Sequence, residues 1–149
     1  MLINECPALW CNNKQNIIGT YPERFNLYVD NLNIGDAVHG LWWRLEEKGD
    51  VVGYGWAEIN GDKAEISIAV SMPQQGKGKG TQILTHLENE LFNRNIFKIK
   101  AKIKSNNPER LVIIDWLQKH GYTLILPPGW SEQLLRQTLL LTVDLVKEL

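Results

Sequence analysis

A glycine-rich turn at residues 75–81 separates two segments with different hydrophobic periods. Residues 64–70 alternate apolar and polar side chains, which is typical of a β-strand, whereas the apolar residues of 83–91 follow helical spacing. Within the turn, glycine occupies every second position, so the backbone can approach a ligand closely and direct several N–H groups to one side. The start of the following helix adds its positive dipole end. The pattern predicts a strand, loop and helix that together bind a pyrophosphate.

Two common phosphate motifs do not fit this turn. A P-loop requires G-x-x-x-x-G-K-[ST], and no Gly-Lys pair stands in that register after Gly76. The dinucleotide fingerprint G-x-G-x-x-G requires a third glycine where Thr81 stands. The pattern that does fit is Q/R-x-x-G-x-G/A, which runs from Gln75 to Gly80. The glycines alone are also compatible with a tight strand-to-helix connection that binds nothing.

Length and composition limit the remaining choices. The 149 residues are expected to form one domain that spans 1–149, and a net charge of −1 provides no overall field for nucleic acid or a membrane surface. The first ten residues lack the pattern of a signal peptide, and no apolar run is long enough to span a bilayer. Cys6 and Cys11 are too few for a metal site or a disulfide framework. We therefore expect a cytoplasmic protein with free thiols and no metal.

Sequence patterns predict secondary structure most clearly between residues 41 and 126, which we take as the core of the domain. We expect an α/β fold with a single mixed, mostly antiparallel sheet flanked by helices, in which 1–40 is irregular and 127–149 ends in a strand. Within 1–40, residues 25–29 alternate like a short strand. A capping signal, Asn107-Pro108-Glu109, starts a helix that Gly121 ends. The strands are expected at 41–46, 51–59, 64–70, 97–103, 122–126 and about 139–145, and the helices at 81–91 and 107–120.

At this point the chain resembles the GCN5-related N-acetyltransferases. The resemblance rests on four segments: 64–70 is similar to the family's fourth strand, 75–81 to its pyrophosphate loop, 105–107 to the end of its fifth strand, and 116–122 to its L-Y-x-K-x-G-F helix ending. Together they lie within about half of the chain. The resemblance implies transfer of an acetyl group from acetyl-CoA to a primary amine by direct attack, without a covalent enzyme intermediate.

The resemblance also assigns coenzyme contacts. The pantetheine arm would lie along the backbone of Ala69 and Val70, where the Val70 N–H is the candidate donor to the oxyanion. Asn107 would contact the coenzyme at the end of the fifth strand, although a helix-capping role is an equal alternative. Gln75 stands where arginine is more common. The pyrophosphate would contact the turn itself, through Gln75, Gly76, Lys77, Gly78, Lys79, Gly80 and Thr81.

Proton transfer is less sharply indicated. The amine must lose a proton before it attacks, and Glu65 is the candidate base, with Glu58, His39 or a chain of water molecules as alternatives. Glu65 could equally make an ordinary cross-strand pair. Leu117 stands where the family has a tyrosine that acts as general acid, so no acid is assigned. The other reading that this leaves open is a non-catalytic acyl-CoA-binding sensor or interaction module.

The acceptor side is the least defined part of the prediction. The resemblance favours a small-molecule amine, and Trp130, on the loop after Pro127-Pro128-Gly129, is the tryptophan expected near it. Trp42 and Trp43 should point to opposite faces of their strand, as core residues or with one of them in the acceptor cleft. We expect a monomer or a homodimer with no nucleic-acid or membrane partner. The lysines that alternate along 98–104 are read as a solvated face.

Overall fold

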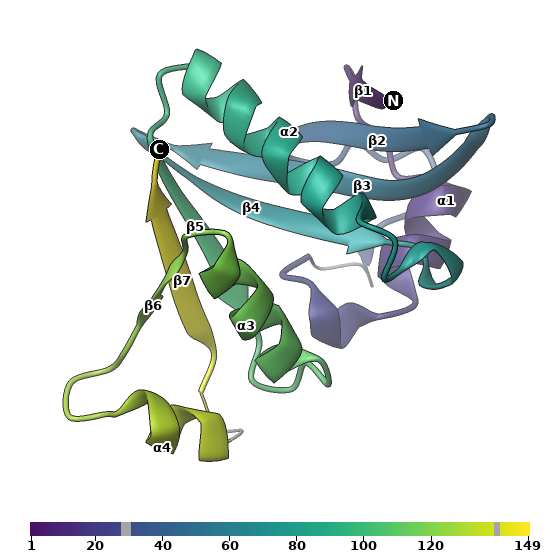
Figure 1. Cartoon of the computed structure of the whole chain (residues 1–149). Helices are drawn as coiled ribbons and strands as arrows, with labels where there is room; N and C mark the ends of the chain where they lie inside the picture. Colours follow the sequence, from purple (N-terminus) through teal and green to yellow (C-terminus); the bar gives the residue numbers. More distant parts are fainter. Residues whose placement is uncertain (28–30, 139–140) are drawn as a thin grey trace.

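Seven strands form one sheet in the computed structural model, which describes residues 1–27, 31–138 and 141–149 (Figure 1). The strand order is β1-β2-β3-β4-β5-β7-β6. Only β4 and β5 run parallel, and the other neighbours are antiparallel, which confirms the expected mixed, mostly antiparallel sheet. The strands are β1 Leu2–Glu5, β2 Leu41–Glu47, β3 Asp50–Asn60, β4 Lys63–Val70, β5 Lys98–Ile103, β6 Thr123–Ile125 and β7 Val143–Glu148.

Two longer helices cover one face of the sheet. Helix α2, Lys79–Asn93, lies across β3 and β4, and α3, Arg110–Lys119, lies beside β5 and β6 (Figure 1). The apolar stripe of α2 fits closely because β3 offers glycine beneath it: a Cβ atom at Gly55 would lie 2.5 Å from a methyl group of Ile83. Helix α3 ends as predicted at Gly121, whose φ of +91° is the left-handed conformation that glycine adopts without strain.

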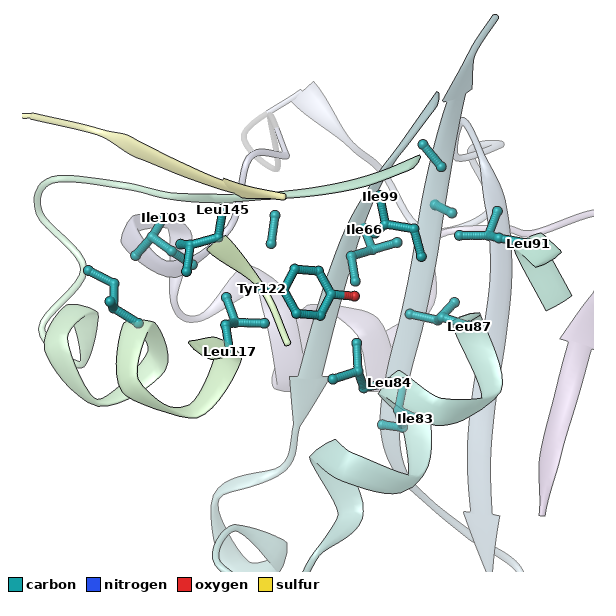
Figure 2. Close-up of a cluster of buried hydrophobic side chains, with 14 of the residues drawn as sticks. Ile66, Ile83, Leu84, Leu87, Leu91, Ile99, Ile103, Leu117, Tyr122 and Leu145 are labelled. Atoms are coloured by element: carbon teal, nitrogen blue, oxygen red, sulfur yellow. The ribbon is translucent and has the colours of Figure 1, made fainter. Parts of the chain in front are cut away.

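A cluster of mainly aliphatic side chains, called the aliphatic cluster below, lies between these helices and the sheet. Its buried members include Ile66, Ile83, Leu84, Leu87, Leu91, Ile99, Ile114, Leu117 and Leu145. In Figure 2 the side chains of Leu84 and Leu87 from α2 and of Leu117 from α3 lie around the ring of Tyr122, which comes three residues after the end of α3. The Tyr122 hydroxyl donates to Glu88 Oε2 at 2.9 Å, and Lys147 Nζ lies 3.0 Å from the same oxygen. Burial, with the nearby Glu88 carboxylate, raises the pKa of Tyr122. The partly buried ion pair between Glu88 and Lys147 joins α2 to the last strand.

Residues before β2 cover the opposite face, and here the expectation needs correction. Strand β1 pairs with β2 from Leu2↔Leu45 to Glu5↔Trp42, so the N-terminus is not wholly irregular. Helix α1, Asn12–Lys14, continues as a π-helical turn at Gln15–Gly19 and is followed by a 3-10 turn at Pro22–Arg24. Residues 25–27 form no strand, and the rest of the strand expected at 25–29 lies outside the described residues.

The C-terminal part contains a helix that the sequence reading missed. Helix α4, Glu132–Gln137, begins at Ser131, whose Oγ accepts a hydrogen bond from Leu134 N at 3.1 Å. The serine and the following glutamate are ordinary capping signals, and a helix of only six residues shows too few turns for a periodic apolar stripe. The expected final strand is observed as β7, although residues 139 and 140 of the expected range lie outside the described residues.

Candidate active site

The sheet splits between its two parallel strands. The register of β4 and β5 runs from Lys63↔Lys98 only to Ile66↔Ala101, while β4 itself continues to Val70. Figure 1 shows the two strands diverging beyond that point. The last four residues of β4 therefore have a paired neighbour on the β3 side only. An extended ligand could take the place of the missing strand.

A cavity of about 430 Å³ occupies this gap. Its walls come from four parts of the chain. Two are the ends of β4 and β5 and the glycine-rich turn at 75–81, called the glycine loop below, with the first turn of α2. The other two are the inner side of α3 and residues 17–26 from the opposite face of the sheet. The volume is in the range of sites for small organic ligands. The cavity thus connects the two faces of the sheet through the gap.

The ladder between β3 and β4 determines which backbone groups face this gap. Ser71 N donates to Val52 O at 2.9 Å, so the polar groups of Ser71 point toward β3. In an antiparallel ladder successive residues point alternately to the two sides. The groups of Ala69 therefore point toward β3, and the Val70 N–H points into the gap. Of the two residues expected beside the pantetheine, both line the cavity, but only Val70 directs its amide there.

The glycine loop is open and has the geometry of an anion site. Gly76 and Gly78 have φ values of +75° and +79°, and no atom lies within 4 Å of the Cβ that either would carry. Gly78 is the N-cap of α2 and makes no side-chain cap hydrogen bond, so the first N–H groups of this 15-residue helix remain free. Amide donors and the helix dipole therefore converge on one spot.

The side chains of the loop have separate roles. Gln75 Nε2 donates to Val70 O at 3.1 Å and ties the loop to the end of β4. Lys79 forms an ion pair with Glu47 in the β2–β3 hairpin, which lowers the pKa of the Glu47 carboxyl. Lys77 is exposed and does not line the cavity. Thr81 Oγ1 lies 3.5 Å from His120 Nε2, so the first turn of α2 contacts the end of α3.

Helix α3 begins at Arg110, three residues after the expected start, and its N-cap is Glu109 without a side-chain cap hydrogen bond. Asn107 is buried beside the cavity, in the turn before this helix. Its Oδ1 accepts a hydrogen bond from Glu109 N at 2.9 Å. Leu117 lies on the cavity wall and is 3% exposed within the aliphatic cluster, so the position where the resemblance places a tyrosine is apolar. Trp116 also lines the cavity and packs near Gly80.

The candidate bases lie away from the cavity wall. Glu65 pairs with Lys100 at 3.5 Å and stands opposite Glu58 in the β3–β4 register. On β4, alternation places Glu65 on the same side as Ser67, which does line the cavity. Glu58 is exposed, and His39 is exposed with its carbonyl bonded to Trp42 Nε1. None of the three carboxylate or imidazole groups is among the cavity-lining residues.

None of the three tryptophans considered for the acceptor side lines the cavity. Trp42 and Trp43 point to opposite faces as expected, and each is buried in a different cluster. Trp130 packs against the aliphatic cluster and does not line the cavity. The residues that complete the cavity in their place are Ile17, Tyr21, Arg24, Phe25 and Asn26. The one pattern noted in this segment, the alternation from residue 25, predicted a strand and gave no sign of a cavity wall, so sequence reasoning missed these residues.

Two further observations concern the described residues, 1–27, 31–138 and 141–149. No helix in them combines the length and the apolar character needed to cross a bilayer. No group of three or more His, Cys, Asp or Glu side chains in them is placed to hold a metal ion.

Comparison with known proteins places this geometry in a family. The model described as "Acetyltransferase (GNAT) family" matches residues 8–124. No curated protein matches the sequence significantly. Many solved structures share the fold.

Three of these structures show the range of structural similarity, sequence identity and coverage. A Klebsiella pneumoniae protein assigned as an acyl-CoA N-acyltransferase has a TM-score of 0.70 and 14% identity, over 100% of this chain and 97% of the other. The IAA acetyltransferase from Bacillus cereus has a TM-score of 0.62 and 18% identity, with 100% of both chains covered. A phosphinothricin acetyltransferase from Sinorhizobium meliloti, in complex with acetyl-CoA, has a TM-score of 0.55 and 22% identity, over 74% of this chain and 61% of the other. At these identities the likeness shows a common fold.

Proposed function

The chain belongs to the acetyltransferase (GNAT) family and is an acyltransferase, and on this premise we propose that it transfers an acetyl group from acetyl-CoA to the primary amine of a small molecule. The observation that carries the proposal is the cavity that begins at the free N–H groups of the glycine loop and runs beside the unpaired edge of β4. A diphosphate fits the loop, and the extended arm of the coenzyme fits the edge.

The proposed reaction is direct attack by the neutral amine on the thioester carbon. The new C–N bond forms as the carbonyl oxygen becomes an oxyanion, which the Val70 N–H stabilises. The C–S bond then breaks and the coenzyme leaves as a thiolate, whose pKa near 8.5 makes it an adequate leaving group without a general acid. This agrees with the apolar Leu117 on the cavity wall.

The proton of the amine needs an acceptor, and we assign Glu65 as the base. It is two residues before Ser67 on the same side of β4, which is roughly 7 Å along a strand. A water molecule at the cavity wall can bridge this distance. The alternative bases are Glu58 and a chain of water molecules alone.

Coenzyme binding is tested by replacing Gly78 with valine. A β-branched side chain is strained at a φ of +79° and would also stand in the open loop, so we expect at least tenfold weaker acetyl-CoA binding by isothermal titration calorimetry. Gly61→Val is the matched control, because Gly61 has a φ of +66° in the β3–β4 turn, away from the cavity. Equal affinities in the two variants would contradict the loop assignment.

The base is tested by Glu65→Gln in a thiol-release assay over a panel of primary amines. General base catalysis contributes about 10²–10⁴-fold, and with a bridging water we expect kcat to fall about a hundredfold while acetyl-CoA affinity is unchanged. Glu58→Gln serves as the comparison. A loss in Glu58→Gln alone would transfer the role to Glu58, and no loss in either variant would leave water as the acceptor.

Turnover itself is tested by the same thiol-release assay on the native protein. Acetyl-CoA binding without thiol release for any primary amine would contradict the proposed reaction, and the absence of acetyl-CoA binding would contradict the assignment of the cavity to the coenzyme.

A further inference from the structure

One end of the cavity, formed by residues distant in sequence from the glycine loop, carries two cationic side chains. Residues 21–26 form this end, together with the end of β5 and the residues that precede α3. Its charged side chains are Arg24, Lys102 and Glu109. The fourth charged residue of the cavity, Lys79, belongs to the glycine loop and is paired with Glu47. Arg24 and Lys102 are therefore the cationic side chains of this end, and the carboxylates beside Arg24 are Glu109 and, outside the cavity lining, Glu23.

The Arg24 guanidinium has unused hydrogen-bond donors. Its Nε is buried without a hydrogen-bond partner. Among the described residues its ion-pair partners are Glu109 Oε2, 3.6 Å from Nη1, and Glu23 Oε1, 4.0 Å from Nε, and both are beyond hydrogen-bond distance. A guanidinium carries five N–H donors, and within the described part of the chain none of them makes a hydrogen bond. A buried donor without a partner is unfavourable until a ligand supplies an acceptor.

The guanidinium is also held in position. It stacks on the ring of Tyr21, with its central carbon 4.9 Å from the ring centroid. Two contacts tie this segment to β5 and the residue after it: Asn26 Nδ2 donates to Lys102 O at 3.4 Å, and Lys104 Nζ donates to Pro22 O at 3.0 Å. A planar donor fork that is both fixed and unsatisfied suits a planar acceptor.

We propose, on the basis of the function proposed above, that the acceptor carries a carboxylate as well as its amine, and that Arg24 binds this carboxylate. Arginine matches a carboxylate with two parallel N–H···O bonds, and Lys102 adds a second positive charge. An acceptor that carried only an ammonium group would offer no hydrogen-bond acceptor to the buried Arg24 Nε. Amino acids and related amino carboxylates are the substrate class that fits.

The first test uses the native protein. Each standard amino acid is compared with its carboxamide, which keeps the amine and the side chain but loses the negative charge. Thiol release from acetyl-CoA is measured for both members of each pair. For the accepted side chain we expect the acid to have a KM at least tenfold lower than the carboxamide. Equal KM values for acid and carboxamide would overturn the proposal.

The second test uses Arg24→Gln. We expect the KM of the acid to rise at least tenfold, kcat to stay within about threefold, and the KM of the carboxamide to be unchanged. Arg24→Lys keeps the charge without the fork and should recover only part of the loss. Arg94→Gln is the matched control, because Arg94 lies at the far end of α2 and pairs only with Glu90 among charged partners. A weaker acetyl-CoA affinity in Arg24→Gln would instead assign Arg24 to the coenzyme and overturn the proposal.

Binding separates this inference from the proposed function. If no amine releases thiol, the transferase function fails, and titration of the coenzyme-A-loaded protein with each pair still measures carboxylate recognition. Preferential binding of the acid that is lost in Arg24→Gln supports the inference in that case, and equal binding of the two members contradicts it.

Discussion

The two faces of the sheet are covered in different ways. On one face, regular helices place an aliphatic cluster against the strands, with Leu84, Leu87 and Leu91 in a single stripe. On the other face, short turns before β2 bury an aromatic cluster in which Trp42 and Trp56 stack with ring centroids 4.4 Å apart. A helix satisfies its own backbone, whereas an irregular segment needs partners for each polar group. The irregular face must therefore bury polar side chains as well.

Lys14 is the clearest example of that requirement. It is 1% exposed, its Nζ lies 2.6 Å from Glu5 Oε1, and it donates to Leu9 O at 2.7 Å. The same ammonium lies over the rings of Trp42 and Tyr54 at 5.2 and 5.0 Å. One buried charge thus connects β1, the chain before α1 and the aromatic cluster. The buried charge on the aliphatic side is Arg110 of α3, which is 2% exposed and donates to Leu135 O at 3.1 Å but pairs with no carboxylate among the described residues.

The largest effect expected from this comparison is on Lys14→Met. Removal of the ammonium leaves Glu5 buried with only the Arg44 guanidinium nearby, at 3.4 Å, and leaves Leu9 O without its donor. We expect a loss of about 3–5 kcal/mol in the free energy of unfolding by urea denaturation. The double variant Lys14→Met, Glu5→Gln should recover part of it, because the uncompensated carboxylate is removed. A loss below about 1 kcal/mol would show that the two faces do not differ in this way.

A smaller effect is expected from alanine at Gly55. The new Cβ would lie 2.5 Å from Ile83 and 3.1 Å from Leu87, so α2 must move away from β3 at a cost of about 1–3 kcal/mol. Gly80→Ala, in the first turn of α2, is the matched control. There the Cβ would lie 3.6 Å from the Trp116 ring, which is an ordinary van der Waals distance. Equal destabilisation of the two variants in thermal unfolding would contradict the close packing assigned to α2.

The smallest effect concerns the half-buried ion pair between Lys79 and Glu47. The lysine lowers the pKa of the carboxyl below its ordinary value of 4.5 in the folded state. Its contribution to stability is therefore present above pH 4.5 and is lost as the pH falls through the lowered pKa. An NMR titration of the Glu47 side chain should show this pKa, and Lys79→Met should return it to the ordinary range. The same Glu47 pKa in the native protein and in Lys79→Met would contradict the ion pair between these two residues.

Much of the aliphatic face could be predicted because its signals are local. The alternation in 64–70, the helical spacing in 83–91 and the left-handed glycine at Gly121 each depend on residues close together in the chain. The glycine loop was predicted for the same reason. The missed elements are short or paired over long distances: β1 is completed by β2 about forty residues later, and α4 has only six residues.

The features of the candidate site also fall into those that local sequence predicts and those that depend on tertiary packing. The sequence by itself determined the strand, loop and helix that present free amides, because dihedral freedom and period are properties of neighbouring residues. Only the tertiary structure decided that β4 and β5 separate after Ile66↔Ala101, that Val70 rather than Ala69 faces the gap, and that Arg24 closes the far end. Those outcomes depend on register and on which distant segment packs beside the gap, and neither is recorded in any single stretch of the chain.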